Sequence, residues 1–323
     1  MHVLIIGAAG MLGARLAASL AGDAAAGVER LTLLDVVPPK APEAAGCAVE
    51  TARLDLGDAA AVAAAVAARP DVIFHLAAIV SGEAEADFEK GYRINFDGTR
   101  NLFEAVRMLP GYTPRLVFTS SIAVFGAPFP DTIPDEYHPT PLTSYGTQKA
   151  MAELLLSDHS RRGVFDGIGI RLPTICVRPG APNKAASGFF SSILREPLVG
   201  REAVLPVEES VRHWHASPRA AVGFLRHAMT LDLERVGQRR NLTMPGVSAT
   251  VGEQIEALRR VAGDGAVALI RRAPDPVIAR IVAGWPARFD ARRAIALGFA
   301  ADASFDAIVA AHVEDELGGR IGA

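Results

Sequence analysis

The chain has 323 residues, half of them hydrophobic and 21% charged, so it has enough apolar surface to form a packed core and is not a disordered protein. A formal net charge of −3 without long blocks of like charge excludes a basic nucleic-acid scaffold. The two cysteines, Cys47 and Cys176, are too few and too far apart for a disulfide framework, which suits a reducing cytoplasm. Charged residues, glycine or proline interrupt every apolar stretch, so we expect no membrane-spanning helix.

The first 22 residues predict a strand, a glycine turn and a helix. Val3 to Ile6 is a short apolar run, typical of a strand buried on both faces, and residues 11–21 have helical periodicity. No Lys or Arg precedes the apolar run, and three glycines and Arg15 interrupt the stretch. We therefore interpret it as folded structure rather than as a secretory signal peptide.

Strands and helices alternate from there to about residue 172. The expected elements are strand 31–34, strand 50–54, helix 58–68, strand 72–76, helix 88–108, strand 116–119, helix 144–162 and strand 167–172. Strands separated by helices require crossover connections, which produce a parallel sheet covered on both faces. We therefore predict an α/β protein whose residues 1–172 form one domain, a Rossmann-type doubly wound parallel sheet.

Beyond residue 172 the pattern changes to a smaller set of elements. Helices are expected at 187–195, 217–231, 248–262, 274–284 and 302–317, and strands at 202–207, 240–244 and 266–270. We predict that residues 173–323 form a smaller C-terminal α/β substrate-binding domain, and we leave open a crossing of the chain back between the domains. Because no polar linker separates them, we expect a shared interface with the binding pocket beside it.

A glycine-rich turn lies between the first strand and the first helix. It reads G-A-A-G-M-L-G and begins at Gly7. Gly7 permits a tight turn, Gly10 lets backbone approach a pyrophosphate, and Gly13 lets the helix pack close to the sheet. The helix N-terminus then presents N–H groups to the phosphates. The alternative is a glycine turn that serves packing alone.

Two aspartates follow the next two strands. Asp35 can accept hydrogen bonds from the adenosine ribose hydroxyls and would repel a 2′-phosphate, which favours NAD over NADP, with Lys40 as the one nearby cation. Asp55 could meet the adenine amino group while Leu56 packs on the ring. A helix N-cap is an equally good interpretation of Asp55, and Asp58 competes for that role.

The candidate catalytic residues come from a helix and a strand end. S-Y-G-T-Q-K places Tyr145 and Lys149 four residues apart, on one helical face. A neighbouring ammonium favours the phenolate, so the phenol can act as a base near neutral pH. An ordinary surface pair is the alternative. The preceding strand runs into Ser120 and Ser121 at the carboxyl edge of the sheet, where ligands of open α/β folds bind.

Together with H-L-A-A at 75–78 and Asn95 on the following helix, these motifs resemble the extended short-chain dehydrogenase/reductase superfamily over roughly residues 1–320. The resemblance implies that Tyr145 is the acid/base, that Ser121 positions the reacting oxygen and that Lys149 holds the nicotinamide ribose and lowers the pKa of the tyrosine. The cofactor it implies is NAD. The implied cofactor-binding residues are Gly7, Gly10, Met11, Leu12, Gly13, Asp35, Asp55, Leu56, Leu76, Ala77, Ala78, Asn95, Tyr145, Lys149, Pro173 and Ile175.

Three stretches, 79–92, 171–190 and 212–221, resemble acid-sugar dehydrogenases of that superfamily. This implies NAD-dependent oxidation of the C2 hydroxyl of a four-carbon sugar acid. Nucleotide-sugar epimerases usually carry N-V-Y-G-P where this chain has T-I-C-V-R-P at 174–179. A nucleotide-sugar epimerase or dehydratase with NAD, and a non-catalytic NAD-sensing protein, are the alternative functions.

An acid substrate needs a cation, and Arg178 is the first candidate because its guanidinium can bind a carboxylate through two parallel hydrogen bonds. Arg212, Asn183 and Lys184 are the alternatives. Ser81 is a candidate partner for a sugar hydroxyl. The expected substrate-binding set is Ser81, Ser121, Tyr145 and Arg178.

His213 and His215 flank Trp214, but no nearby cysteine or acidic residue completes a metal shell, so we predict no metal and a structural or substrate-shaping role. The only partner expected besides the small substrate is a second copy of the chain. Helices 88–108 and 144–162 would form a four-helix interface in a homodimer. We expect no nucleic-acid or membrane partner.

Overall fold

The computed structural model describes residues 1–180 and 186–322, which divide into two compact units. The first unit comprises Met1–Val124, Thr143–Arg171 and Val222–Leu242. The second comprises Phe125–Leu142, Leu172–Ala221 and the residues from Thr243 on. The division therefore differs from a single boundary at residue 172, because one early segment joins the second unit and one late segment returns to the first.

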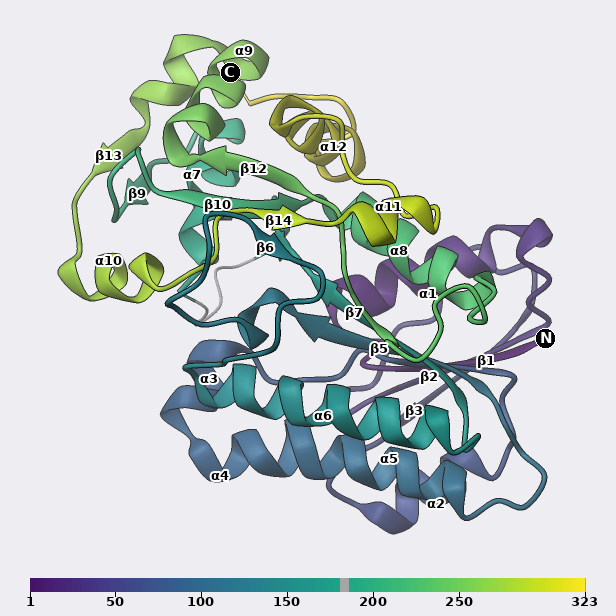
Figure 1. Cartoon of the computed structure of the whole chain (residues 1–323). Coiled ribbons are helices and arrows are strands. Elements are labelled where there is room, and N and C mark those ends of the chain that lie inside the picture. The colour runs from purple at the N-terminus through teal and green to yellow at the C-terminus, as the bar shows by residue number, and fades with distance from the viewer. Residues whose placement is uncertain (181–185, 323) are drawn as a thin grey trace. The chain divides into compact units, whose positions relative to one another are not determined.

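The first unit is built on a seven-stranded sheet (Figure 1). Its strands are β1 (His2–Ile6), β2 (Arg30–Asp35), β3 (Ala48–Arg53), β4 (Val72–His75), β5 (Arg115–Ser121), β7 (Asp166–Leu172) and β11 (Asn241–Thr243), in the order β11-β7-β5-β4-β1-β2-β3. Pairing is parallel from β3 through β2, β1 and β4 to β5. The strand order reverses between β1 and β4, and a crevice at the carboxyl ends of such strands is where open α/β sheets bind ligands.

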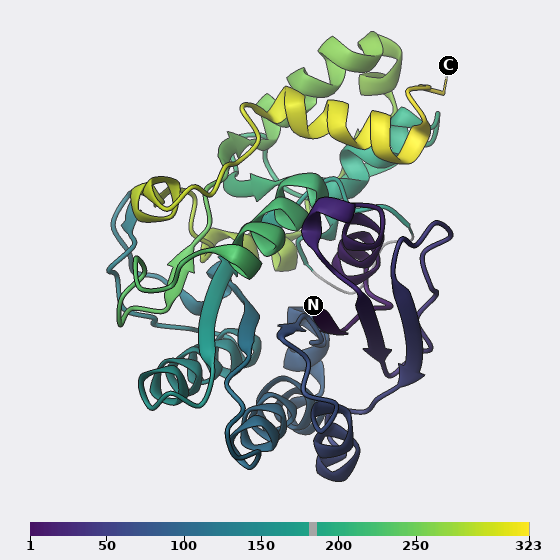
Figure 2. The same cartoon turned by 90° about the vertical axis from the view of Figure 1, so that its right-hand side faces the viewer.

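Helices cover both faces of this sheet. They are α1 (Met11–Ala21), α2 (Ala59–Val66), α3 (Ser81–Ala86), α4 (Phe88–Gly91), α5 (Gly98–Arg107) and α6 (Ser144–Arg161). α2, α5 and α6 lie side by side on one face, and the purple helix α1 lies on the other (Figure 2). This layering confirms the predicted doubly wound α/β fold and explains why β1, β4 and β5 are buried along most of their length.

Local sequence accounts for where these helices begin. The side chain of Asp58 accepts hydrogen bonds from the N–H groups of Ala60 and Ala61, so Asp58 is the N-cap of α2. Thr143 caps α6 by accepting from the N–H of Gly146 at 3.1 Å. The expected helix 88–108 is divided into α4, a π-helical segment at Tyr92–Asp97 and α5. A π-helical segment inside a longer helix often marks a functional site.

The second unit consists of short strands and helices. Its elements are β6 (Ile133–Pro134), β8 (Thr174–Ile175), α7 (Gly188–Leu198), β9 (Ala203–Leu205), β10 (Arg212–Ala216), β12 (Val247–Thr250), α9 (Val251–Ala268), β13 (Ile270–Arg272), α10 (Pro276–Ala283), β14 (Phe289–Asp290), α11 (Arg292–Ala296) and α12 (Phe305–Leu317), with α8 (Pro218–Thr230) running from this unit into the first. The expected strand 266–270 is wrong, because α9 extends through Ala268. No strand was expected at β10. Within the described residues, no helix is both long and apolar enough to cross a membrane.

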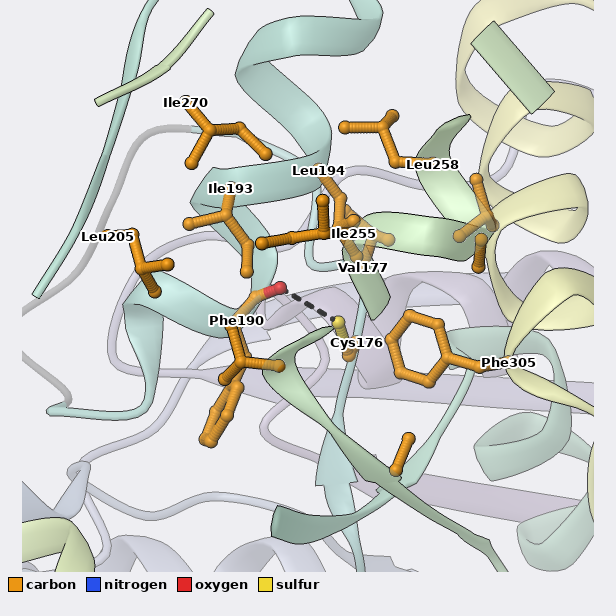
Figure 3. Close-up of a cluster of buried hydrophobic side chains, with 14 of the residues drawn as sticks. Cys176, Val177, Phe190, Ile193, Leu194, Leu205, Ile255, Leu258, Ile270 and Phe305 are labelled. Carbon is orange, nitrogen blue, oxygen red and sulfur yellow. Dashed lines mark hydrogen bonds between the residues drawn. The ribbon is translucent and has the colours of Figure 1, made fainter. Parts of the chain in front are cut away.

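The core of the second unit gathers around α7. Phe190, Ile193 and Leu194 of this helix are buried against Ile255 and other apolar side chains of α9 and α12 (Figure 3). The Phe190 carbonyl accepts a hydrogen bond from the Cys176 thiol, with an S···O distance of 3.3 Å. This apolar core holds the segment that carries Arg178.

Candidate active site

The glycine turn fits closely against the loop after β4. Gly7 has φ +93°, and a Cβ at this position would lie 2.5 Å from the backbone nitrogen of Ala77. A Cβ on Gly13 would collide with the Gly7 carbonyl oxygen. Gly10 is the N-cap of α1, and no described side chain caps this helix, so its first N–H groups are available to a phosphate. This backbone cradle is what a dinucleotide pyrophosphate requires.

Asp35 lies beside the same turn. Its Oδ2 accepts a hydrogen bond from the Ala9 N–H at 3.0 Å, and its Oδ1 accepts one from the Val37 N–H at 3.3 Å. The carboxylate is therefore held at the end of β2, at the edge where a ribose bound to the turn would lie.

The second aspartate has protein partners. The Gly57 N–H donates to Asp55 at 2.8 Å, and together with the Arg93 guanidinium it holds the pKa of Asp55 below its ordinary value. Leu56 is only 4% exposed and belongs to the core cluster of the first unit. A Cβ at Gly98 would lie 2.7 Å from the Leu56 Cβ, so Leu56 packs on α5.

Asn95 connects the loop after β4 to α6. It lies in the π-helical segment and is 1% exposed. Its Oδ1 accepts from the Ile79 N–H at 2.9 Å, and its Nδ2 donates to Gln148 Oε1 at 2.8 Å. The loop itself begins at Leu76, whose N–H donates to the Ile6 carbonyl at 2.9 Å, and continues through the half-buried Ala77 and Ala78. These bonds fix the loop that faces the glycine turn.

Lys149 is the central charged group of the site. It is 2% exposed, and its Nζ donates to the Thr119 carbonyl of β5 at 2.8 Å. The same nitrogen lies 4.7 Å from the centre of the Phe118 ring and 5.8 Å from the centre of the Tyr145 ring. Burial lowers the pKa of Lys149 to about 7, and the charge of Glu153 opposes this shift. The lysine therefore changes charge near neutral pH.

Ser121 and Tyr145 lie at the more exposed side of this arrangement. Phe118 is the last β5 residue paired with β4, so β5 extends three residues further to Ser121. The Ser121 Oγ accepts from the Ala123 N–H at 3.1 Å and is half-buried, as is Tyr145 in the first turn of α6. A phenol with an ammonium 5.8 Å from its ring centre, and a serine hydroxyl, are the groups that an acid/base site for an alcohol or ketone requires.

Arg178 lies in the second unit, after β8. Its Nε donates to the Ile175 carbonyl at 2.9 Å, and its backbone N–H donates to Ser191 Oγ at 3.0 Å. Ile175 is paired with Ala216 of β10, and Pro173 precedes β8. The half-buried guanidinium is thus held by the backbone of its own loop, which sets its orientation.

The other candidate substrate residues have different surroundings. Arg212 donates to the Ser248 carbonyl at 3.0 Å and pairs with Glu253 at 3.2 Å, so its charge is compensated. Asn183 and Lys184 lie outside the described residues. Ser81 is the first residue of α3 and is half-buried.

The two histidines of β10 are structural. His213 Nδ1 donates to the Pro286 carbonyl at 3.0 Å, so its Nε2 accepts from Thr174 Oγ1 at 2.7 Å. Burial lowers the pKa of His213 to about 4 and that of His215 well below its ordinary value. The described residues contain no group of three or more His, Cys, Asp or Glu that could hold a metal.

Sequence reasoning missed one buried charge network. Glu153, one helical turn after Lys149, is 2% exposed and forms an ion pair with Arg171 of β7 at 2.7 Å. Ser120 donates to the same carboxylate at 2.5 Å. The available signal was the four-residue spacing from Tyr145 through Lys149 to Glu153, which places all three on one helical face.

Comparisons with known proteins find similar chains. Residues 3–228 match the family described as "NAD dependent epimerase/dehydratase family". The chain is 48% identical to a D-erythronate dehydrogenase of Cupriavidus necator over 98% of both chains, and 43% identical to one of Haemophilus influenzae over 98% of this chain and all of that protein. A crystal structure named as a nucleoside-diphosphate-sugar epimerase from Agrobacterium tumefaciens is 66% identical, with a TM-score of 0.96 over 99% of this chain and 95% of that chain.

Two glycine substitutions test the cradle. Gly7→Ala places a methyl group against the Ala77 nitrogen and should raise the Kd for NAD at least ten-fold, measured by calorimetry. Gly27→Ala is the matched control, since Gly27 also has positive φ (+65°) but nothing lies within 4 Å of its added Cβ. Both variants carry the backbone strain of about 1–2 kcal/mol. Equal NAD affinity in the two variants would contradict the proposed contact.

Proposed function

Because the chain belongs to the NAD dependent epimerase/dehydratase family, we propose that it is an NAD-dependent dehydrogenase that oxidises the C2 hydroxyl of D-erythronate to 2-oxo-tetronate. The observation that carries this proposal is the buried Lys149, which lies near the Tyr145 ring and donates to the Thr119 carbonyl of β5, the strand that ends at Ser121. The identities of 48% and 43% to D-erythronate dehydrogenases, over nearly the whole chain, support the choice of substrate.

The proposal gives each site residue a chemical role. Tyr145, as the phenolate, removes the proton from the C2 hydroxyl, and Ser121 Oγ donates a hydrogen bond to the same oxygen. NAD, when bound, supplies the acceptor for the hydride that leaves C2. The Lys149 ammonium stabilises the phenolate by charge and holds the ribose hydroxyls. The pyrophosphate is held by the first turn of α1, whose N–H groups have no side-chain cap among the described residues.

The substrate carboxylate is assigned to Arg178. A guanidinium binds a carboxylate through two parallel charge-assisted hydrogen bonds, and the backbone contacts of Arg178 orient it in advance. Ser81 is assigned to a sugar hydroxyl. Asp35 is assigned to the adenosine ribose hydroxyls, which favours NAD over NADP.

The alternative is a nucleotide-sugar epimerase, which the name of the 66% identical Agrobacterium tumefaciens protein favours. An epimerase keeps its NAD and returns the hydride, so it accumulates no NADH. The segment T-I-C-V-R-P at 174–179 differs from the N-V-Y-G-P that such epimerases usually carry, and this favours the dehydrogenase. An NAD-sensing protein without catalysis would have no need of a catalytic base at Tyr145.

We assign a cytoplasmic location and a homodimer to the protein. Cys47 and Cys176 are both free thiols, which suits a reducing compartment. Leu154 on α6 is 72% exposed and Phe88 on α4 is 56% exposed, so these helices retain apolar surface that a second copy would cover. Sedimentation equilibrium measures this state directly, and a monomer at micromolar concentration would contradict it.

The substrate assignment predicts that purified protein accumulates NADH, read at 340 nm, when given NAD and D-erythronate. NADP should be a poorer cofactor because of Asp35. UDP-sugars should produce neither NADH nor an epimerised product, which a chromatographic assay would detect. Epimerisation of a UDP-sugar without NADH release would instead establish the alternative function.

The acid/base role predicts that Tyr145→Phe loses turnover. Because a positioned acid/base group contributes about 10²–10⁴-fold in rate, kcat for D-erythronate should fall by that factor. NAD should still bind, since the glycine turn, Asp35 and Lys149 are unchanged in this variant. Tyr137→Phe, at a second half-buried tyrosine whose hydroxyl donates to the Pro128 carbonyl, is the control and should keep its kcat. An unchanged kcat in Tyr145→Phe would refute the role.

The carboxylate assignment predicts a change confined to the acid substrate. Arg178→Ala should raise KM for D-erythronate about 10- to 100-fold, the loss of a charged hydrogen bond worth about 1.5–3 kcal/mol. KM for NAD should not change. Arg212→Ala serves as the control, because Glu253 and the Ser248 carbonyl already hold that arginine. Equal KM values for D-erythronate in wild type and Arg178→Ala would reject the assignment.

A further inference from the structure

We propose that Glu153 is a positioning residue of this dehydrogenase: held between Ser120 and Arg171, it fixes α6 against β5 and favours the ammonium form of Lys149. The inference rests on the proposed function, since it explains what favours the charged form of Lys149, a residue of the proposed site. Glu153 itself touches neither the substrate nor the cofactor in this account and acts through Lys149.

Both carboxylate oxygens of Glu153 accept hydrogen bonds. Its Oε1 accepts from Ser120 Oγ at 2.5 Å and from Arg171 Nε at 2.9 Å, and its Oε2 accepts from Arg171 Nη2 at 2.7 Å. Glu153, Arg171 and Ser120 are 2%, 6% and 3% exposed. These contacts join α6, β7 and β5, which carry Glu153, Arg171 and Ser120. A shift of one element would separate the buried charges, so the buried ion pair fixes how the three pack together.

The network is placed where it can fix the catalytic residues. Tyr145, Lys149 and Glu153 follow one another at four-residue steps on α6, so they lie on one face of the helix. On β5, Ser120 precedes Ser121 and follows Thr119, whose carbonyl accepts from Lys149. Two adjacent bonds therefore join α6 to the end of β5, one from Lys149 and one to Glu153. Together they set how far Tyr145 stands from Ser121.

The charges around Lys149 give Glu153 a second effect. On α6, Tyr145 and Glu153 are the titratable groups beside Lys149, and Glu153 is the charge that raises the pKa of the lysine. On β4, His75 is neutral, because burial first and the Lys149 charge second lower its pKa to about 3. β5 contributes the Thr119 carbonyl and the Phe118 ring, and β7 contributes Arg171 through its pair with Glu153.

Removing the Glu153 carboxylate should therefore lower the pKa of Lys149. An opposite charge nearby favours the charged form of a group, so its loss favours the neutral amine. NAD binding and turnover both depend on the ammonium in this account. The alkaline decline of NAD binding and of turnover should therefore begin at a lower pH in a variant that lacks the Glu153 carboxylate.

The test measures the pH dependence of two quantities between pH 5 and 10: the Kd for NAD by calorimetry, and kcat for D-erythronate. The variants are Glu153→Gln and the double variant Glu153→Gln/Arg171→Gln, which leaves no buried unpaired arginine and so keeps a folded protein to measure. Lys149→Met shows which part of each pH profile is caused by titration of the lysine. Glu104→Gln is the control, because Glu104 also contacts α6, at 3.3 Å from His159 near the opposite end of that helix from Tyr145.

The expected result is a lower alkaline midpoint in both Glu153 variants, in the NAD affinity as well as in kcat: about one pH unit lower in Glu153→Gln, and lower by less in the double variant, which also loses the Arg171 charge. Glu104→Gln should keep the wild-type midpoint, and Lys149→Met should lose the alkaline decline in NAD affinity. A double variant with the wild-type midpoint would overturn the proposal, as would an alkaline decline that survives in Lys149→Met. The NAD readout needs no turnover, so failure of the Tyr145 or substrate assignment is distinguishable from failure of this inference.

Discussion

The burial of one ammonium group is the constraint on which the site depends. Lys149 is 2% exposed, and its Nζ reaches the Thr119 carbonyl across the gap between α6 and β5. A buried charge is expensive unless it is bonded, so this contact and the nearby Glu153 carboxylate determine whether the lysine remains charged. The Tyr145 ring lies over the same nitrogen, which couples the ionisation of the phenol to that of the lysine.

The rest of the first unit brings a dinucleotide to this point. The strand order reverses between β1 and β4, and the glycine turn after β1 packs so closely on the loop after β4 that a Cβ at Gly7 would lie 2.5 Å from Ala77 N. Asn95 holds that loop to α6 through Gln148, which lies next to Lys149. The loop that packs on the glycine turn and the helix that carries Tyr145 and Lys149 are thus joined through the buried Asn95 side chain.

Much of the first unit could be predicted from sequence because its signals are local. The apolar runs, the G-A-A-G-M-L-G turn and the four-residue spacing of Tyr145 and Lys149 predict elements that the structure confirms. Glu153 and Arg171 are distant in sequence and look like ordinary surface residues, so their burial together depends on tertiary packing. The two- to five-residue strands of the second unit carry too little periodicity to predict, as β10 and the misplaced strand 266–270 illustrate.

The most direct test is to titrate Lys149 itself. The chain has four lysines, Lys40, Lys90, Lys149 and Lys184, so an NMR titration of protein labelled at lysine Cε gives few resonances, and the one absent from Lys149→Met is assigned to Lys149. The account predicts that this resonance titrates near pH 7 in the free protein. Titration at the ordinary lysine value, about 10.4, would show a solvated side chain and contradict the buried ammonium on which the proposed site rests.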